Sequence, residues 1–158
     1  MVWAHDPSAA SPPPVDGMTG LSGTVVHGQG RGTGLGFPTA NIDCPTHQLP
    51  ADGIYAGVVH VEHDPVLRSA VMSVGSNPTF GNHLSRRLEV HLIDFDGDLY
   101  GQRLVVDLLL RMRPMERYDG AEVMVQQALA DLERCRALFA ALNAQSYDGV
   151  PVRDLECW

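Results

Sequence analysis

Lysine is absent from the 158-residue sequence, and all 11 of its positively charged side chains are arginine. This absence excludes the phosphate-binding lysine of a P-loop, the Schiff-base lysine of pyridoxal enzymes and any lysine general base. If the protein handles phosphate groups, we therefore expect arginine, a metal ion and backbone amides to neutralise their charge.

Positive charge is scarce overall, because 11 basic residues stand against 19 acidic ones and the formal net charge is −8. The arginines form no dense block in the sequence. Nucleic acids and anionic membranes attract clustered positive charge, so we expect neither as a partner. Small molecules are the expected ligands, and we expect a monomer.

Cysteine is rare, and the pattern of Cys44, Cys135 and Cys157 contains no C-x-x-C pair. An odd number without such a pair predicts neither a disulfide framework nor a zinc site. The first positive side chain is Arg31, so the charged start of a signal peptide is missing. No apolar run approaches the roughly 18 residues of a spanning helix. We therefore expect a soluble protein of the cytoplasm.

The composition divides the chain into three parts. Residues 1–19 contain three consecutive prolines and few bulky apolar residues, which predicts a disordered segment. Residues 20–143 are expected to form one domain, and 144–158 a tail. Within the domain, clusters of Gly, Pro, Asn and Asp separate short segments of β character, which predicts an antiparallel sheet or a small barrel. These segments are 24–27, 54–61, 70–74, 88–93 and 104–110.

The last long segment has the pattern of an amphipathic helix. Asp119 can cap its start, with Glu122 three residues later, and Asn143 is the expected end. Such a stripe serves either as a coiled-coil surface or as the core face of a single helix, and we favour a helix that closes a β domain. Its apolar residues stand at 121, 125, 128, 132, 135, 139 and 142. A protein-interaction module would instead require Val125, Leu132 and Phe139 to be exposed.

Glycine occupies every second position from Gly28 to Gly36. Glycine at this density lets the backbone approach a ligand closely and lets amides converge on an anion. No Lys-Ser or Lys-Thr follows, which excludes a Walker A loop, and Phe37-Pro38 follows in place of a helix, which excludes the dinucleotide fingerprint. Flexible filler and a phosphate-facing flap remain the alternatives, and Arg31 within the segment favours the flap.

Thr39 and Asn41 follow the glycines directly. In an extended segment, residues two positions apart point the same way. Hydroxyl and amide oxygens are hard ligands that Mg²⁺ accepts beside phosphates and water. The alternative is a turn with local side-chain to backbone hydrogen bonds; the neighbouring glycines favour the metal.

Glu89 lies in the middle of a predicted strand, on the face opposite the apolar residues at 88, 90 and 92. It is either exposed to solvent on an amphipathic strand or lines a cavity as a general base. His91 shares its face, as a second polar liner or a surface histidine. The acidic run 94–98 lacks the distal glutamate of a calcium loop, which predicts a hairpin turn.

The order of these motifs resembles that of riboflavin kinases over about residues 20–140. The segments that carry the resemblance are GTVVHG (23–28), LGFPTAN (35–41), GIYAG (53–57), SVGSNPTF (73–80), LEVH (88–91) and RMRP (111–114). The blocks PTAN and LEVH are the most specific of them.

The resemblance implies a mainly β fold, namely a six-stranded antiparallel Greek-key barrel with a long C-terminal α-helix. It also implies transfer of the ATP γ-phosphate to the ribityl 5′-hydroxyl of riboflavin, giving FMN. Thr39 and Asn41 would hold Mg²⁺, and Glu89 would be the general base. Flavin binding is implied for Arg113, Met115 and Tyr118. ATP binding is implied for His27, Gly28, Arg31, Gly32, Gly36, Pro38, Thr39, Asn41 and Tyr100.

Two departures from the family pattern shape the expectations. Thr33-Gly34 stands where a basic or longer polar residue is expected after Arg31-Gly32. This motivates the alternative of a catalytically weak flavin- or nucleotide-binding or regulatory protein on the same fold. The resemblance also begins near residue 20, and no His-x-Gly-His nucleotidyltransferase motif occurs. FAD synthesis is therefore not expected.

Overall fold

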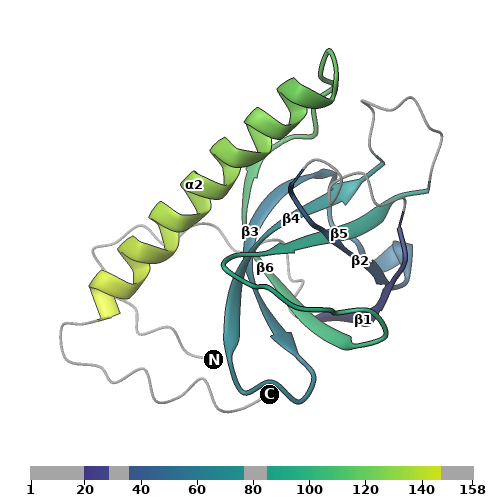
Figure 1. The fold of residues 1–158 in the computed structure, drawn as a ribbon, viewed down its shortest axis with the longest axis vertical. Coiled ribbons are helices and arrows are strands. Elements are labelled where there is room, and N and C mark those ends of the chain that lie inside the picture. The colour runs from purple at the N-terminus through teal and green to yellow at the C-terminus, as the bar shows by residue number, and fades with distance from the viewer. Residues whose placement is uncertain (1–19, 29–35, 77–84, 147–158) are drawn as a thin grey trace.

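Six antiparallel strands close into a barrel in the computed structural model, which describes residues 20–28, 36–76 and 85–146 (Figure 1). Around the barrel the strands follow the order β1-β2-β5-β4-β3-β6. The strands are β1 (Leu21–Val26), β2 (Ala40–Asp43), β3 (Gly53–Val61), β4 (Leu67–Gly75), β5 (Arg87–Leu92) and β6 (Arg103–Arg113). A single 3₁₀ turn, η1 (Thr46–Gln48), precedes β3, and helix α2 (Ala121–Ser146) follows β6. The predicted fold class is confirmed.

Strand β2 is the element that the residue pattern missed. It has four residues, of which Ile42 alone is buried, so no alternation of apolar and polar residues is visible in the sequence. The strand is held by its neighbours, because Val26 of β1 and Glu89 of β5 both pair with Asn41. The reading of 38–41 as a turn is therefore wrong from Ala40 onwards.

The run 94–98 does not form the predicted hairpin turn. Strands β5 and β6 are not neighbours in the barrel, because β2 and β4 flank β5 while β1 and β3 flank β6. A hairpin joins adjacent strands, so the connection 93–102 is a crossover at the mouth of the barrel. Within it, Asp94 has a φ of 54°, in the left-handed region that few residues other than glycine adopt.

The barrel interior holds the main apolar core. Its most buried side chains include Tyr55, Met72, Leu88 and Leu104, each 1% exposed or less. Along β5, Leu88, Val90 and Leu92 point inward, as their alternation predicts, and Glu89 and His91 are half-buried on the outer face. The polar residues of β5 thus lie outside the core, where they can meet a ligand.

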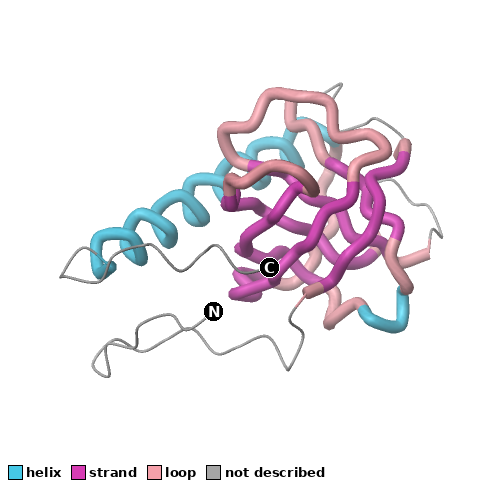
Figure 2. The backbone as a smooth tube through the Cα atoms, turned by 90° about the horizontal axis from the view of Figure 1, so that it is seen from below, coloured by secondary structure: helices cyan, strands magenta, loops and turns pink. Residues whose placement is uncertain are grey.

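Helix α2 covers part of the outer face of the barrel and builds a second apolar cluster there (Figures 1 and 2). Cys135 is fully buried, and Leu132 and Phe139 are half-buried against the cluster. Burial raises the pKa of the Cys135 thiol to about 11, so the neutral thiol donates to the carbonyl of Ala70 on β4 at 3.5 Å. Leu132 and Phe139 pack on the barrel and Val125 is half-buried, whereas the interaction-module reading requires all three to be exposed.

The helix does not end at Asn143 but continues to Ser146. Asparagine is only a moderately poor helix former, while the alanine and glutamine that follow it are good ones, so the helix continues past Asn143. In the described part of the chain, no helix combines the length and apolarity that crossing a membrane requires. The predicted disordered segment 1–19 lies outside the described residues, as does the tail from 147 onwards.

Candidate active site

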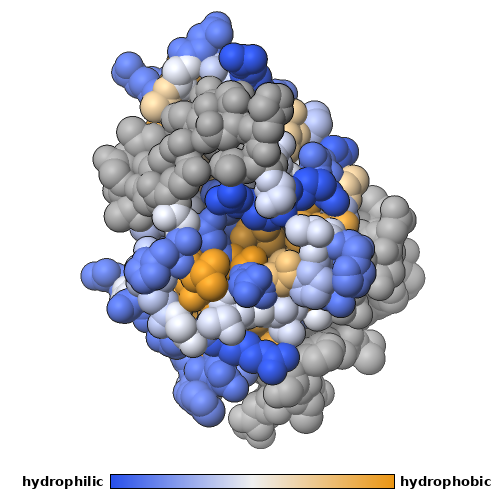
Figure 3. Space-filling view, turned by 90° about the vertical axis from the view of Figure 1, so that its right-hand side faces the viewer, coloured by the Kyte–Doolittle hydropathy of each residue, from blue (hydrophilic) through white to orange (hydrophobic). Residues whose placement is uncertain are grey.

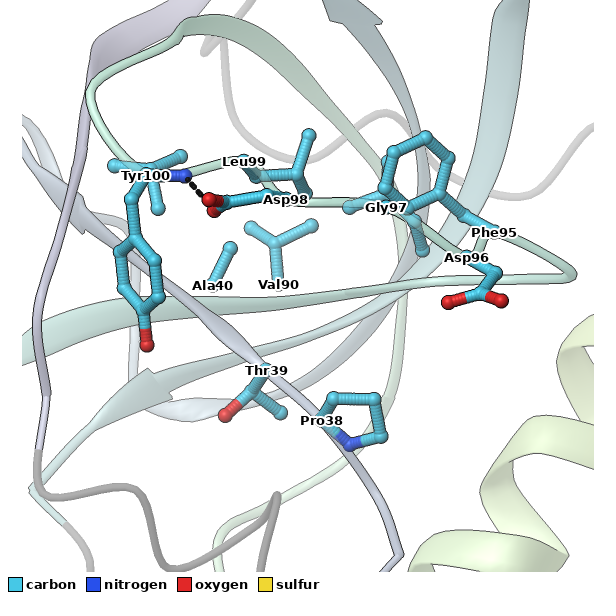
Figure 4. Close-up of a pocket in the computed structure, with 12 residues that line it drawn as sticks. Pro38, Thr39, Ala40, Val90, Phe95, Asp96, Gly97, Asp98, Leu99 and Tyr100 are labelled. Atoms are coloured by element: carbon cyan, nitrogen blue, oxygen red, sulfur yellow. Dashed lines mark hydrogen bonds between the residues drawn. The ribbon is translucent and has the colours of Figure 1, made fainter.

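A cavity of about 520 Å³ opens at the mouth of the barrel. Val25 and Leu92 are among its apolar lining residues. Pro38 and Thr39 lie on one side of the cavity and the crossover residues 95–100 on the other, with Ala40 and Val90 between them (Figure 4). On the side where Figure 1 shows β1 and β2, apolar side chains gather in a hollow surrounded by hydrophilic ones (Figure 3). An apolar cavity of this size with a few polar groups is typical of small-molecule sites.

Beside the cavity, the strand register brings two predicted site residues together. Asn41 of β2 pairs directly with Glu89 of β5. Directly paired residues in an antiparallel sheet share a face, with Cβ atoms about 4.5–5.5 Å apart. Thr39 lies two positions before Asn41 and lines the cavity. The structure therefore pairs Asn41 with Glu89 on the outer face of the barrel, while Thr39 lies two positions away at the cavity.

The carboxamide of Asn41 is the unusual polar group of this region. Its Oδ1 atom is buried and has no hydrogen-bond partner among the described residues. The backbone of Gly28 presses on the same side chain, since a Cβ at position 28 would lie 2.1 Å from Asn41 Nδ2. An unsatisfied buried acceptor costs about 1–3 kcal/mol. This oxygen is thus held in a position that a cation or a donor can complete.

The donor set fits Mg²⁺ bound together with a nucleotide. In the described part of the chain, no cluster of three or more His, Cys, Asp or Glu residues could hold a metal by itself. Mg²⁺ often takes one or two protein ligands and completes its shell with phosphate oxygens and water. The oxygens of Thr39 and Asn41 could serve as the protein ligands.

Some of the other residues assigned to ATP lie at the same cavity. The ring of His27 stacks on that of Tyr100, with centroids 3.8 Å apart and planes at 25°. Tyr100 and Pro38 line the cavity, and Gly36 has a φ of 78°, which favours glycine. Arg31 and Gly32, also assigned to ATP, lie outside the described residues.

The flavin-assigned residues lie at the far end of β6. Arg113 pairs with Ile54, which pairs with Ser73, which pairs with Glu89. At about 4.8 Å per strand, these three steps amount to about 14 Å along the sheet. Because six strands close the barrel, β6 lies opposite β5, so the β-strand positions of Arg113 and Glu89 are on opposite sides of the barrel.

Arg113 forms an ion pair within the protein that was not predicted from the sequence. Its Nη2 and Nε atoms donate to the carboxylate of Asp131 on α2, at 2.7 and 3.0 Å, and Nη1 donates to the carbonyl of Pro114 at 3.1 Å. Asp131 is 1% exposed. It precedes Leu132 of the apolar stripe, and a carboxylate at the edge of such a stripe was the available signal.

Met115 and Tyr118 lie on the segment that Arg113 anchors. Met115 packs against the apolar cluster under α2. Burial raises the pKa of Tyr118, so its hydroxyl stays protonated and donates to Glu116 Oε2 at 3.2 Å. The guanidinium of Arg113 lies 5.8 Å from the centre of the Tyr118 ring, within the range of a cation–π contact.

Known proteins resemble this chain in sequence and in fold. The RNA-binding riboflavin kinase RibR of Bacillus subtilis (strain 168) is 38% identical over 115 residues, which cover 73% of this chain and 49% of that protein. The bifunctional riboflavin kinase/FMN adenylyltransferase of Pseudomonas fluorescens is 37% identical over 120 residues, covering 76% and 38%. The chain spans less than half the length of these two relatives.

The solved structure of riboflavin kinase from Trypanosoma brucei has the same fold, with a TM-score of 0.59 and 21% identity over 91% of this chain and 95% of that one. The family model described as Flavokinase, riboflavin kinase, matches residues 18–139. The expected family is thereby confirmed: the chain belongs to the riboflavin kinase family.

Proposed function

We propose that the protein transfers the γ-phosphate of ATP, with Mg²⁺, to the ribityl 5′-hydroxyl of riboflavin and so forms FMN. The observation that carries this proposal is the pairing of Asn41 with Glu89 beside the barrel-mouth cavity. This pairing places a candidate metal ligand and a candidate base directly opposite each other on neighbouring strands. Membership of the riboflavin kinase family supports the same activity.

The nucleotide would occupy the cavity in one orientation. Asp96 and Asp98 lie on the crossover wall, and the carboxylate of Asp98 accepts a hydrogen bond from the amide of Tyr100 at 2.9 Å (Figure 4). These negative charges disfavour the triphosphate at that wall. The base and sugar would therefore lie near Tyr100, and the phosphates would point towards Thr39 and Asn41.

Thr39 and Asn41 would hold Mg²⁺ through their side-chain oxygens. The ion would supply neutralisation of the phosphate charge, which phosphoryl transfer requires. Gly28 leaves room for the Asn41 carboxamide against the backbone, because a Cβ at this position would lie 2.1 Å from Asn41 Nδ2. The protein's own contribution is to fix these groups in place before the reaction, so that little reorganisation is needed.

Glu89 would orient the 5′-hydroxyl of riboflavin and accept its proton. An alcohol is far less acidic than a carboxylic acid, so we expect the proton to move late, as the phosphoryl group is captured. Orientation of the hydroxyl in line with the phosphate contributes as much as basicity does. Both roles require the half-buried position that Glu89 has on the outer face of β5.

Riboflavin would approach Glu89 from the side on which Met115 and Tyr118 lie. Met115 and the ring of Tyr118 offer apolar and aromatic surface for a flavin ring. Arg113, whose donors face Asp131 and Pro114, would act by fixing the segment that carries them. Direct contact of Arg113 with the flavin stays a prediction.

The test is to incubate the purified protein with riboflavin, ATP and Mg²⁺ and to measure FMN by chromatography. We expect FMN to accumulate, and EDTA to stop its formation. Flavin binding measured by fluorescence accompanies the assay. A protein that binds riboflavin but forms no FMN would contradict the proposed activity and favour the binding or regulatory alternative.

A further inference from the structure

Thr39 lies in a segment that precedes strand β2 and forms no strand pairs. Strand β2 begins at Ala40, so Phe37, Pro38 and Thr39 precede its hydrogen-bonded pairs. Pro38 has no N–H group and cannot donate to a neighbouring strand. A residue that must present its hydroxyl to a cation within a few tenths of an ångström needs another support.

His91 supplies two contacts to this segment. Its Nδ1 atom lies 2.6 Å from the carbonyl oxygen of Pro38. Because a carbonyl oxygen can only accept, Nδ1 must carry the proton and donate it. The ring also stacks on that of Phe37, with centroids 3.9 Å apart and planes at 20°. The two residues before Thr39 are thus each held by His91.

The same strand also carries the candidate base. Val90 pairs with Ala40 and Glu89 with Asn41, so the next positions along the two strands are His91 and Thr39. His91 does not line the cavity of the described residues, and its two printed contacts are with Phe37 and Pro38. Strand β5 therefore carries Glu89 itself, and through the side chain of His91 it contacts the segment that leads to Thr39.

We propose that His91 is a positioning residue that holds Thr39 in line with Asn41 for the metal–nucleotide complex, through the hydrogen bond to Pro38. This inference rests on the proposed function, because it takes the cavity as the site of Mg²⁺ and nucleotide. Partners behind metal ligands commonly contribute about 10–100-fold to metal affinity or activity. The ring stack with Phe37 orients the imidazole, and the hydrogen bond fixes the backbone.

Two variants separate the two contacts. His91→Phe keeps an aromatic ring against Phe37 but removes the donor, whereas His91→Asn keeps a donor near the Nδ1 position but removes the ring. Binding of ADP is measured calorimetrically with Mg²⁺ and, separately, with EDTA. His47→Phe and His47→Asn are matched controls, since His47 is exposed on η1.

We expect His91→Phe to weaken binding of ADP with Mg²⁺ about tenfold and to leave binding of ADP with EDTA unchanged. The KM for riboflavin is expected to stay at its wild-type value, and His91→Asn to bind nearly as wild type does. The His47 variants should match wild type throughout.

Wild-type affinity for ADP with Mg²⁺ in a folded His91→Phe protein would overturn the proposal. Equal losses in His91→Phe and His91→Asn would overturn it as well, because the hydrogen bond would then not be the support. Because ADP binding does not require turnover, the calorimetric measurement tests the role of His91 independently of catalysis. A wild-type protein that bound ADP with Mg²⁺ but formed no FMN would contradict the proposed function alone.

Discussion

Buried polar side chains outside the barrel core have different hydrogen-bonding environments in two regions. Between helix α2 and the barrel, Asp131 of α2 is buried, and its carboxylate accepts hydrogen bonds from Arg113 and, at 3.3 Å, from Gln127. Around β2 and β5, the Oδ1 atom of Asn41 is buried without a partner among the described residues. The first arrangement stabilises the fold, whereas the second leaves a buried acceptor that the described part of the fold does not satisfy.

The two regions differ in whether the fold supplies a partner for a buried polar group. Buried charges are tolerated only where they are paired, and the helix side satisfies this rule. Functional sites commonly break such a rule at a cost in stability. We therefore expect substitutions in the helix region to change stability, and substitutions in the β2–β5 region to change binding and catalysis.

The largest stability effect is expected for Asp131→Asn. It leaves the half-buried Arg113 guanidinium without its carboxylate, and removing one partner of a buried ion pair costs about 3–5 kcal/mol, with the lower end expected for a pair that is buried on one side only. Urea unfolding followed by circular dichroism measures the loss. Glu133→Gln, on the exposed side of the same helix, is the control and should change little. A loss as small as that of the control would contradict the bracing role of the pair.

Asn41→Ala should separate binding from stability. It removes the unsatisfied acceptor and some packing against Gly28, so we expect the free energy of unfolding to change by less than about 1 kcal/mol. Binding of ADP with Mg²⁺ should fall markedly, because one proposed ligand is lost. If the variant were as destabilised as Asp131→Asn, the contrast between the two regions would be lost.

The smallest effect is expected at the exposed ion pair of Arg136 and Asp94, whose two hydrogen bonds are both 2.7 Å long. Hydrogen bonds from Arg136 hold the pKa of the Asp94 carboxyl below its usual value. A lowered carboxyl pKa stabilises the folded state above the carboxyl's ordinary pKa, and this contribution disappears as the pH falls through the folded-state pKa.

Arg136→Gln should therefore lower the Tm slightly at neutral pH and by progressively less as the solution is made acidic. High salt should also reduce the difference, because exposed charges are screened. Thermal unfolding across a pH series, at low and high salt, measures both trends. A difference that grew towards acidic pH would contradict this assignment.

The parts of the fold that follow from local patterns were predictable. Alternation along 88–93 predicted which side chains of β5 enter the core, and the apolar stripe predicted which face of the helix packs. Strand β2 was not predictable from its pattern, because four residues with one buried side chain carry no period. The crossover at 94–98 was missed because local sequence does not show that β5 and β6 have other neighbours.

The candidate site was proposed from the sequence as a set of residues, but its geometry could not be. The types of Thr39, Asn41 and Glu89 suggested their chemistry, while the pairing of Asn41 with Glu89 depends on a contact between strands far apart in the sequence. The partnership of Arg113 with Asp131 is equally non-local. The contacts of His91 became visible only once the strand register placed it opposite the segment before β2.

The most direct test of the central claim compares FMN formation by Glu89→Gln with that by wild type at saturating riboflavin, ATP and Mg²⁺. A general base typically contributes about 10²–10⁴-fold, so we expect the turnover number to fall by at least about a hundredfold while the variant folds normally. Glu62→Gln, at an exposed position beside the β3–β4 turn, should retain full activity. Turnover by folded Glu89→Gln at the wild-type rate would contradict the account.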